Sequence, residues 1–154
     1  MVPAMFGERA RVYDLIYDSK DYEGEADTLR DLLEREGVEE GSTVVEAACG
    51  TGRYLQWLDG WYDVAGFDIS SQMLEIARRR LDGSVVYEAD METHVADEPV
   101  EALVCLFSSI GYVHGKDKLR RTFQNFYASL IPGGVVVIEP WVLAGNLEAG
   151  RPRM

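Results

Sequence analysis

The sequence predicts an α/β fold in which a doubly wound parallel sheet carries helices on both faces. The first observation is that short apolar strands alternate with amphipathic helices between residues 43 and 138. The second is that the strands expected at 101–107 and 135–138 are apolar at nearly every position, which is typical of strands covered on both faces. The third is a glycine-containing loop directly after the first strand, where sheets of this class bind their ligands.

The other elements follow from local patterns. Further strands are expected at 43–47, 63–68 and 85–88, and helices at 6–17, 25–36, 53–58, 70–81 and 116–130. Ser70 is placed to cap the helix that runs to Leu81, because its side-chain oxygen can accept a free backbone N–H. The run from Pro132 to Gly134 is expected to break the chain before a fully buried last strand.

Length and composition limit the classes of protein. The 154 residues suit one domain, with a helical segment at 1–40, a core at 41–140 and a short tail at 141–154. The net charge of -12 argues against nucleic acid or an anionic membrane surface as a partner. No apolar stretch approaches the ~20 residues of a membrane helix, and no signal-peptide pattern opens the chain. We therefore expect an acidic cytoplasmic protein.

The two cysteines, Cys49 and Cys105, lie in apolar, strand-like surroundings. Neither has a second cysteine or histidine at the spacing of a metal site. Reduced, buried thiols and no metal site are therefore expected.

The segment from Glu46 to Gly52 carries the strongest functional signal. Ala47 and Ala48 are small enough for the backbone to approach a ligand, and Gly50 and Gly52 can adopt the positive φ angles of a tight turn. The helix that follows presents free N–H groups to the same place. The residues predict a ligand-binding loop, with a tight turn that holds no ligand as the alternative.

A Gly-x-Gly loop alone is compatible with a nicotinamide cofactor, a flavin or S-adenosyl-L-methionine. The dinucleotide fingerprint needs a third small residue three positions after the second glycine, and that position is Leu55. Glu46 is unfavourable beside a pyrophosphate but favourable beside the positive sulfur and the ammonium group of S-adenosyl-L-methionine. The residues therefore favour this sulfonium cofactor, and they disfavour a nicotinamide oxidoreductase.

Four segments resemble the motifs of class I S-adenosylmethionine-dependent methyltransferases. Glu46 to Gly52 is similar to their first motif, Gly66 to Leu74 to their second, Ala89 to Met91 to their third, and Leu130 to Gly134 to the turn before their fifth strand. The matches are collinear from about residue 42 to residue 139. The resemblance implies a Rossmann-like sheet with strand order 3-2-1-4-5 and S-adenosyl-L-methionine as the cofactor.

The first two motifs give residues roles on the cofactor. Asp68 ends the second strand, 22 residues after Glu46, and a carboxylate there can accept hydrogen bonds from both ribose hydroxyls. Asp68 can instead act as a negative charge at the N-terminus of the next helix. By the resemblance, Glu46 neighbours the methionine amino group. Ile69 and Met73 are expected against the adenine face, although Met73 by itself is more typical of a core.

The third motif implies contacts with the base. Asp90 ends the third strand, and by the resemblance it meets the adenine amino group, with Met91 beside it. A turn aspartate is the alternative interpretation of Asp90. His94, a little further along, is expected to be solvated in an acidic loop.

The flanking segments resemble a narrower group, the methyltransferases that act on amino-sugar nucleotides. Residues 13–17 and 20–22 are similar to their N-terminal lid, and residues 107–112 and 139–141 to their segments after strands four and five. The resemblance implies that Tyr13 and Tyr22 approach the cofactor carboxylate and sulfonium, and that Phe107 lines the cofactor site. Tyr13 also fits the apolar face of a simple amphipathic helix.

Candidate catalytic residues follow from the chemistry of methyl transfer. The reaction is a direct displacement, so an enzyme mainly aligns the reactants and excludes water. A base is needed only when the nucleophile arrives protonated. His114, on the loop after the fourth strand, is the candidate base, and Tyr112 is the candidate for orienting the substrate. His114 fits an exposed loop position equally well.

The C-terminal segment departs from the family pattern. The relatives continue after strand five with an antiparallel hairpin of strands six and seven, which residues 141–154 are expected to lack. Val135 to Ile138 would then form a bare apolar edge of the sheet. Because exposed edges seek pairing partners, we expect either a homo-oligomer formed through this edge or a fragment.

Two functions therefore stand side by side. The first is a methyltransferase that acts on a small-molecule acceptor, with an amino-sugar nucleotide suggested by the flanking resemblance. The alternative is a catalytically impaired module that binds S-adenosyl-L-methionine, or a subunit of a larger assembly.

Overall fold

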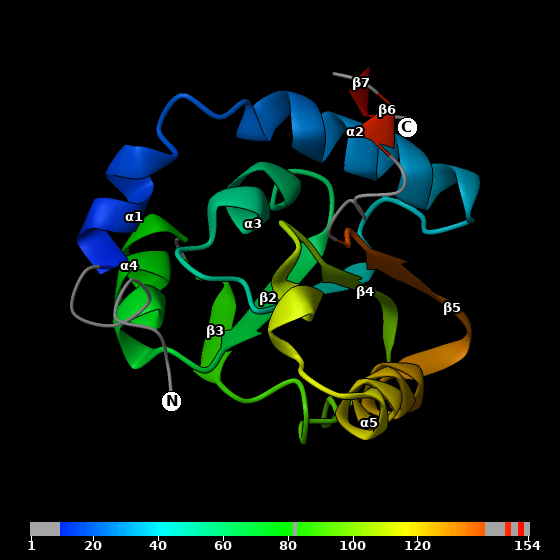
Figure 1. Ribbon diagram of the computed structural model, residues 1–154. Coiled ribbons are helices and arrows are strands. Elements are labelled where there is room, and N and C mark those ends of the chain that lie inside the picture. The colour runs from blue at the N-terminus through cyan, green and yellow to red at the C-terminus, as the bar shows by residue number, and fades with distance from the viewer. Residues whose placement is uncertain (1–9, 82, 141–146, 149–150, 153–154) are drawn as a thin grey trace.

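A five-stranded parallel sheet lies at the centre of the computed structural model (Figure 1). The structure describes residues 10–81, 83–140, 147–148 and 151–152. The strands are β1 (Thr43–Ala47), β2 (Asp63–Asp68), β3 (Val85–Glu88), β4 (Val100–Cys105) and β5 (Leu130–Ile138). Their order is β3-β2-β1-β4-β5, and all neighbouring pairs are parallel. The predicted doubly wound sheet and its strand order are confirmed.

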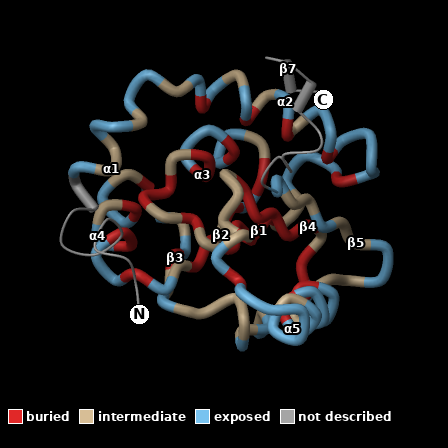
Figure 2. Tube along the Cα trace, viewed as in Figure 1, coloured by how far each residue is buried: buried red, intermediate tan, exposed pale blue. Residues whose placement is uncertain are grey.

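Helices cover both faces of this sheet. They are α1 (Ala10–Ile16), α2 (Tyr22–Arg35), α3 (Arg53–Leu58), α4 (Ser71–Arg80) and α5 (Lys116–Ala128), with a short 3-10 helix η1 (Ser109–Tyr112). Val44 packs with α2, α3 and α4 in one apolar cluster, whereas its neighbour Val45 packs with η1 and α5 in a second. Successive strand residues point to opposite faces. Figure 2 shows that burial is greatest in β1 and β4 and falls toward β5.

Local capping explains where two helices begin. The Ser70 hydroxyl accepts a hydrogen bond from the Met73 N–H at 3.2 Å, so the predicted cap of α4 is confirmed. Helix α2 begins at Tyr22, three residues before the predicted start, because the Asp21 side chain accepts a hydrogen bond from the Gly24 N–H at 3.0 Å. The predicted first helix ends at Ile16, and its residues 6–9 lie outside the described ranges.

Strand β4 is shorter at its carboxyl end than predicted. It ends at Cys105 rather than at residue 107. Phe107 and Ser108 have φ angles of 50° and 59°, and a strand cannot continue through the left-handed region. Helix α5 likewise ends at Ala128, because Leu130 already pairs with Val100 in the sheet.

Strand β5 differs from the prediction in extent and burial. Leu130 pairs with Val100 and Val135 pairs with Ala102, so residues 131–134 bulge opposite a single residue of β4. The predicted break is this bulge, in which Gly133 has a φ of 86°. The expectation of full burial is wrong, since Val136 is 36% exposed. The reason is that β5 is an edge strand of the sheet.

The expected tail contains a minimal hairpin. Strands β6 (Leu147–Glu148) and β7 (Arg151–Pro152) pair antiparallel as a separate two-stranded sheet. This two-stranded hairpin does not extend the main sheet. Among the described strands, none pairs with the outer edge of β5. Trp141, which belongs to a predicted motif, lies outside the described residues.

Two features of the described ranges concern membrane and metal binding. None of the helices there combines the length and the apolar character that crossing a membrane requires. In the same ranges, no three or more His, Cys, Asp or Glu side chains are grouped so that they can hold a metal ion. Cys49 and Cys105 are both free and buried.

Candidate functional site

The predicted ligand loop lies at the carboxyl end of β1, where the strand order reverses. From β1 the sheet continues through β2 to β3 on one side and through β4 to β5 on the other. Parallel sheets bind ligands in the crevice outside the strand ends at such a point. The loops after β1, β2 and β4 therefore meet at one edge of the sheet and form the candidate site.

The loop after β1 turns sharply and exposes its backbone at one glycine. Ala48, Gly50 and Gly52 have φ angles of 58°, 54° and 74°. A Cβ on Gly50 would meet no atom of the described residues within 4 Å, so they leave the space beside this glycine open. A Cβ on Gly52 would lie 3.0 Å from Leu81 Cδ1 and 3.3 Å from Ala77 Cβ. Gly52 thus serves close packing against α4, whereas Gly50 lets a ligand approach the backbone.

Asp68 ties this loop to the end of β2. Its Oδ2 accepts a hydrogen bond from the Gly50 N–H at 2.9 Å, and its Oδ1 accepts one from the Ser70 N–H at 2.8 Å. Burial raises the pKa of Asp68, and these backbone hydrogen bonds oppose the rise. The Ile69 N–H is a third backbone donor to this carboxylate. Because each carboxylate oxygen has two lone pairs, Asp68 keeps capacity to accept a further hydrogen bond, such as that of a hydroxyl.

Glu46 has a buried carboxyl group, one oxygen of which lacks a hydrogen-bond partner among the described residues. Its residue is 3% exposed, and within the described part of the chain Oε2 has no hydrogen-bond partner. Burial, followed by the negative charge of Asp68, raises the pKa of Glu46 well above its ordinary value. Such a group destabilises the fold unless a donor or a positive charge reaches it. The position fits a cationic ligand and does not fit a pyrophosphate.

The lid tyrosines approach the site from the N-terminal segment. The Tyr13 ring lies 4.8 Å from the Tyr17 ring, centroid to centroid. Burial raises the pKa of Tyr13, and the proximity of Tyr22, Tyr17, Tyr112 and Glu46 raises it further. Tyr22, the second predicted residue of this segment, has its ring 5.1 Å from the Tyr54 ring at the start of α3, and the role of both tyrosines at the site stays a prediction.

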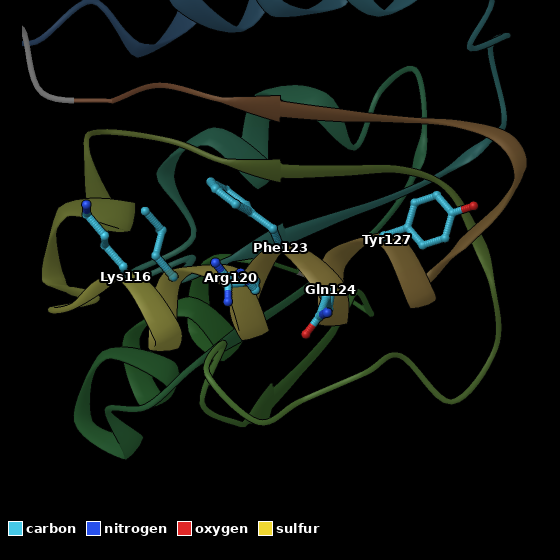
Figure 3. Close-up of a pocket in the computed structure, with 6 residues that line it drawn as sticks. Lys116, Arg120, Phe123, Gln124 and Tyr127 are labelled. Atoms are coloured by element: carbon cyan, nitrogen blue, oxygen red, sulfur yellow. The ribbon is translucent and has the colours of Figure 1, made fainter.

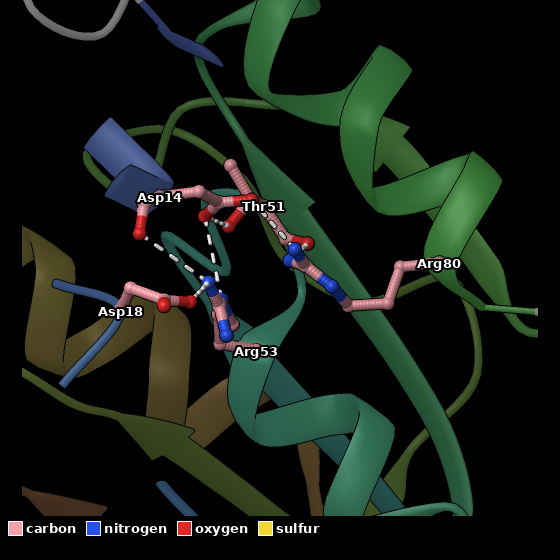
Figure 4. A network of polar contacts seen from close by, with 5 residues as sticks. All are labelled: Asp14, Asp18, Thr51, Arg53 and Arg80. Atoms are coloured by element: carbon pink, nitrogen blue, oxygen red, sulfur yellow. Dashed lines mark hydrogen bonds and ion pairs between the residues drawn. The ribbon is translucent and has the colours of Figure 1, made fainter. Parts of the chain in front are cut away.

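A charged network fastens α1 to the ligand loop and to α4 (Figure 4). Asp14 accepts a hydrogen bond from Thr51 Oγ1 at 2.6 Å and pairs with Arg80 at 2.6 Å and with Arg53 at 3.5 Å. Arg80 also donates to the Thr51 carbonyl, and Arg53 reaches Asp18 at 3.4 Å. Burial by itself raises the pKa of Asp14, but the hydrogen bonds from Thr51 and Arg80 and the two arginine charges lower it overall. We call these five residues the Asp14 network.

Sequence reasoning missed the Asp14 network. The only local signal was that Asp14 lies within the tyrosine-containing lid segment. Nothing in the sequence marks Arg80, which is 66 residues away from Asp14. Thr51 is 2% exposed, so its hydroxyl needs a hydrogen-bond partner inside the protein. The Gly-x-Gly pattern accepts any residue at the middle position, so the pattern does not predict this partner.

The segment after β4 is strained and is held from two sides. Phe107 and Ser108 both lie in the left-handed region, which costs about 1–3 kcal/mol for each such residue. The Phe107 N–H donates to Glu139 Oε2 at 2.7 Å. The Phe107 ring meets the Tyr17 ring edge-on, at 4.9 Å between centroids. Phe107 is therefore fixed between the end of β5 and the lid.

The residues predicted to contact a base differ in exposure. Ile69 is 50% exposed, whereas Met73 is 1% exposed and lies in the packed interior. Asp90 Oδ1 accepts a hydrogen bond from the Glu92 N–H at 2.8 Å, which is the turn geometry of the alternative interpretation. Met91 packs on the apolar cluster below α5. Of the residues predicted to contact the base, Ile69 is the one whose apolar side chain is half exposed.

The candidate catalytic residues occupy different surroundings. Tyr112 is 51% exposed on η1 and lies near enough to Tyr13 to influence its pKa. His114 is exposed on the loop before α5. The structure brings Tyr112 to the lid, while the described residues provide no hydrogen bond or ion pair that orients His114.

His94 is not solvated as the sequence suggested. Its ring centroid lies 4.8 Å from that of Phe67 and 5.2 Å from that of Tyr87. The distance from His94 Nε2 to the Tyr87 hydroxyl is 3.0 Å. The expectation is wrong because residues 90–94 form a turn, in which the His94 N–H donates to the Asp90 carbonyl at 2.8 Å. This turn folds the ring onto the sheet.

A surface cavity of about 490 Å³ lies on α5, away from the ligand loop (Figure 3). It is lined by Lys116, Leu119, Arg120, Phe123, Gln124 and Tyr127. All of these side chains come from one helix, and the strand ends contribute none of them. The cavity is therefore separate from the candidate site.

Comparison with known proteins agrees with this geometry. Residues 44–134 match the methyltransferase domain family. The chain is 39% identical over 157 aligned positions to the dTDP-3-amino-3,6-dideoxy-alpha-D-glucopyranose N,N-dimethyltransferase of Streptomyces fradiae. That alignment covers 94% of this chain and 61% of the relative.

Solved structures show the same likeness. The crystal structure of DesVI from Streptomyces venezuelae matches with a TM-score of 0.84 and 35% identity, covering 94% of this chain and 62% of that one. The S-adenosylmethionine-bound structure of CalS10, an amino pentose methyltransferase from Micromonospora echinaspora, matches with a TM-score of 0.82 and 28% identity, covering 91% and 60%. The chain therefore spans about three fifths of the length of these relatives. With its ligand loop, sheet order and family match in agreement, the chain belongs to the methyltransferase domain family.

Proposed function

We propose that this chain binds S-adenosyl-L-methionine at the ends of β1, β2 and β4 and takes part in methyl transfer to a small molecule. The acceptor class that we propose is a nucleotide-linked amino sugar, methylated on nitrogen. The observation that carries the proposal is the buried Glu46 carboxylate, whose Oε2 has no partner in the described residues, beside the open backbone of Gly50. The printed name of the Streptomyces fradiae relative supports the acceptor class.

In this proposal each polar group of the site meets a matching part of the ligand. Glu46 receives the ammonium group, because a positive charge relieves its buried negative charge. Asp68 receives the ribose hydroxyls with the acceptor capacity that its backbone hydrogen bonds leave free. Ile69 offers its exposed apolar surface to adenine, and Asp90 lies at the end of the neighbouring strand.

S-adenosyl-L-methionine, held by Glu46, Asp68 and Ile69, would supply an electrophilic methyl group to the acceptor nitrogen. The residues of the chain align the acceptor and exclude water. Tyr13, Phe107 and Tyr112 form the wall of the reaction site. His114 takes the proton that the nitrogen loses when the acceptor arrives as an ammonium ion.

A second candidate function keeps the cofactor site without turnover by this chain alone. In it, the chain is a binding module or one subunit of a larger assembly. The observation that favours it is that the chain spans only 61% of the Streptomyces fradiae relative. A radiolabelled methyl-transfer assay with dTDP-linked 3-amino sugars separates the two candidates, because only the first yields a labelled sugar.

The cofactor site is tested by calorimetric titration with S-adenosyl-L-methionine. We expect binding that Asp68→Asn weakens at least about tenfold, which corresponds to the loss of one hydrogen bond to a charged group. Asp63→Asn is the matched control, because Asp63 is exposed at the opposite end of the same strand. Equal affinity in both variants, or no binding heat from a folded wild-type chain, contradicts the proposal.

Association and location complete the proposal. We propose that copies of the chain associate through the outer edge of β5 and that nucleic acid and membranes are not partners, in keeping with the net charge of -12. A cytoplasmic location accords with the two free thiols.

A further inference from the structure

Lys20 holds its charge inside a ring of aromatic side chains. Its Nζ lies 5.1 Å from the centroid of the Tyr22 ring, 5.5 Å from that of Tyr54 and 5.1 Å from that of Phe107. An ammonium group within about 6 Å of an aromatic centroid is attracted to the face of the ring, more strongly where water is excluded. The Lys20 side chain is only 16% exposed.

The three rings belong to three different parts of the fold. Tyr22 opens α2, Tyr54 lies on α3, and Phe107 follows β4. Tyr22 and Tyr54 are 5% and 6% exposed, and their ring centroids are 5.1 Å apart. We call the three rings around Lys20 the aromatic cage. Packing fixes the Tyr22 and Tyr54 rings of this cage, whereas Phe107 lies on a loop.

Glu25 anchors the cage on the side of the helices. Lys20 forms an ion pair with Glu25, and the Tyr54 hydroxyl donates to the same carboxylate oxygen at 2.5 Å. The ammonium group is thus tied to α2 and α3 through Glu25, Tyr22 and Tyr54. Its remaining aromatic contact, with Phe107, joins these helices to the segment after β4.

Phe107 needs such a contact because of its backbone. It and Ser108 are two consecutive non-glycine residues in the left-handed region, a conformation that persists only where the surroundings impose it. The Glu139 carboxylate holds the Phe107 N–H, and the Tyr17 ring meets its side chain. Lys20 supplies the third restraint, and it is the only one of the three that carries a positive charge.

We propose that Lys20 is a positioning residue for methyl transfer, whose ammonium group holds Phe107 against the lid and keeps the segment after β4 in its left-handed conformation. The inference rests on the proposed function, since it assigns Lys20 a role at that site. The N-terminal segment around Lys20 and the segment after β4 are then coupled, so that a change that mobilises one also mobilises the other.

The test follows amide hydrogen exchange at Phe107 in the full chain, which needs no ligand. In Lys20→Met we expect exchange about tenfold faster at Phe107, as one lost cation–π contact allows. Lys116→Met is the matched control, since Lys116 is exposed on α5 and lines the separate cavity. Lys20→Arg keeps a cation that binds aromatic faces and should restore most of the protection. Unchanged exchange at Phe107 in a folded Lys20→Met chain overturns the inference.

A second measurement separates this inference from the proposed function. Wild-type binding of S-adenosyl-L-methionine tests the proposed function alone. If Lys20→Met binds S-adenosyl-L-methionine about tenfold more weakly while Lys20→Arg binds it as wild type does, the position that Lys20 gives to Phe107 affects ligand binding. Should Lys20→Met fail to fold, Lys20→Gln takes its place in both measurements, and wild-type protection of Phe107 in that variant counts against the inference.

Discussion

At the residue scale, three carboxylates near the site have different electrostatic surroundings. Burial raises the pKa values of Glu46 and Asp68, since it disfavours the charged form of each group. Asp14 is also desolvated, but Arg80 and Arg53 lower its pKa. The three carboxyl groups therefore differ in kind: Glu46 is buried without a hydrogen-bond partner for Oε2 among the described residues, Asp68 accepts backbone hydrogen bonds, and Asp14 is an ion-paired anchor that stays charged to lower pH.

The raised pKa of Glu46 predicts how the free energy of unfolding depends on pH. An acid can have a higher pKa in the folded chain than in the unfolded chain. Between these two pKa values, the folded state then binds more protons than the unfolded state does. The free energy of unfolding therefore falls as pH rises above the ordinary glutamate pKa of about 4.3, by up to about 1.4 kcal/mol per pH unit for one proton. We expect Glu46→Gln to lack this component of the pH dependence. Urea unfolding between pH 4.5 and pH 8 in about half-unit steps measures it.

The same substitution separates stability from binding. Because Glu46→Gln removes the charge that we propose for the ammonium group, it should weaken binding of S-adenosyl-L-methionine without lowering stability at neutral pH. A variant that binds as tightly as wild type leaves Glu46 without a role in the site. Glu101→Gln is the control, since Glu101 is half-buried on β4 and bonds the Thr43 N–H at 2.9 Å, at the opposite end of the strands.

At the element scale, the site depends on how α1, α3 and α4 are joined. Helix α1 contacts α4, and the Asp14 network links both to the ligand loop at the start of α3. Helix α1 has only seven residues, and helices of this length are not stable alone. Its position over the site therefore depends on these tertiary contacts.

The Asp14 network predicts how α1 responds to substitution and to pH. Asp14→Asn removes the ion pairs and should destabilise the docking of α1 by about 1.5–3 kcal/mol. Because the folded pKa of Asp14 is lowered, its contribution is complete above the ordinary aspartate pKa of about 3.9 and is lost as pH falls through the folded value. Hydrogen exchange of the α1 amides measures the change.

The control for this prediction is an exposed ion pair on α2. Asp27→Asn removes a carboxylate that is 51% exposed and 3.6 Å from Arg30, and exposed pairs contribute little. Equal protection of α1 in the two variants would show that the Asp14 network does not hold the lid.

The start of α3 makes a second prediction at this scale. Gly52→Ala combines a positive φ with a Cβ that crowds Leu81, whereas Gly41→Ala has a similar φ of 82° and no atom within 4 Å of the new Cβ. The Gly41 variant should lose about 1 kcal/mol from backbone strain, and the Gly52 variant clearly more. Thermal and urea unfolding of both variants isolates the packing component. Similar losses contradict the tight contact between α3 and α4.

At the scale of the whole molecule, the two edges of the sheet differ. Edge strand β3 has four residues, whereas edge strand β5 has nine and includes Val136, which is 36% exposed. Near it, α5 exposes Phe123 and Tyr127 at 43% and 81%. A long apolar edge beside exposed aromatic rings is the kind of surface through which chains associate.

Association through β5 is predicted to respond to one charge. We expect Val136→Lys to shift the chain toward monomer in sedimentation velocity across a concentration series, because a lysine on an edge strand opposes pairing. Val85→Lys is the control on the other edge, where Val85 is 62% exposed on β3. A wild-type chain that sediments as a monomer at every concentration excludes this mode of association.

Apart from the strand order, which the family resemblance implied, the sequence by itself determined the strands and the sharp turn after β1. The expected bounds 43–47, 53–58, 63–68 and 85–88 agree with the structure residue for residue. These features are encoded locally: apolar runs select buried strands, and the glycines at 50 and 52 permit the positive φ angles of the turn. Local signals of this kind are readable before any tertiary contact is known.

Only the tertiary structure decided which side chains act together. Three contacts join segments whose proximity the sequence does not predict. They are the ion pair between Asp14 and Arg80, the ring contacts of His94 and the aromatic cage around Lys20. The same holds for the exposure of Val136, which depends on the position of β5 in the sheet rather than on its apolar sequence. The physical reason is that backbone preference depends on adjacent residues, whereas burial and charge pairing depend on what the fold brings close.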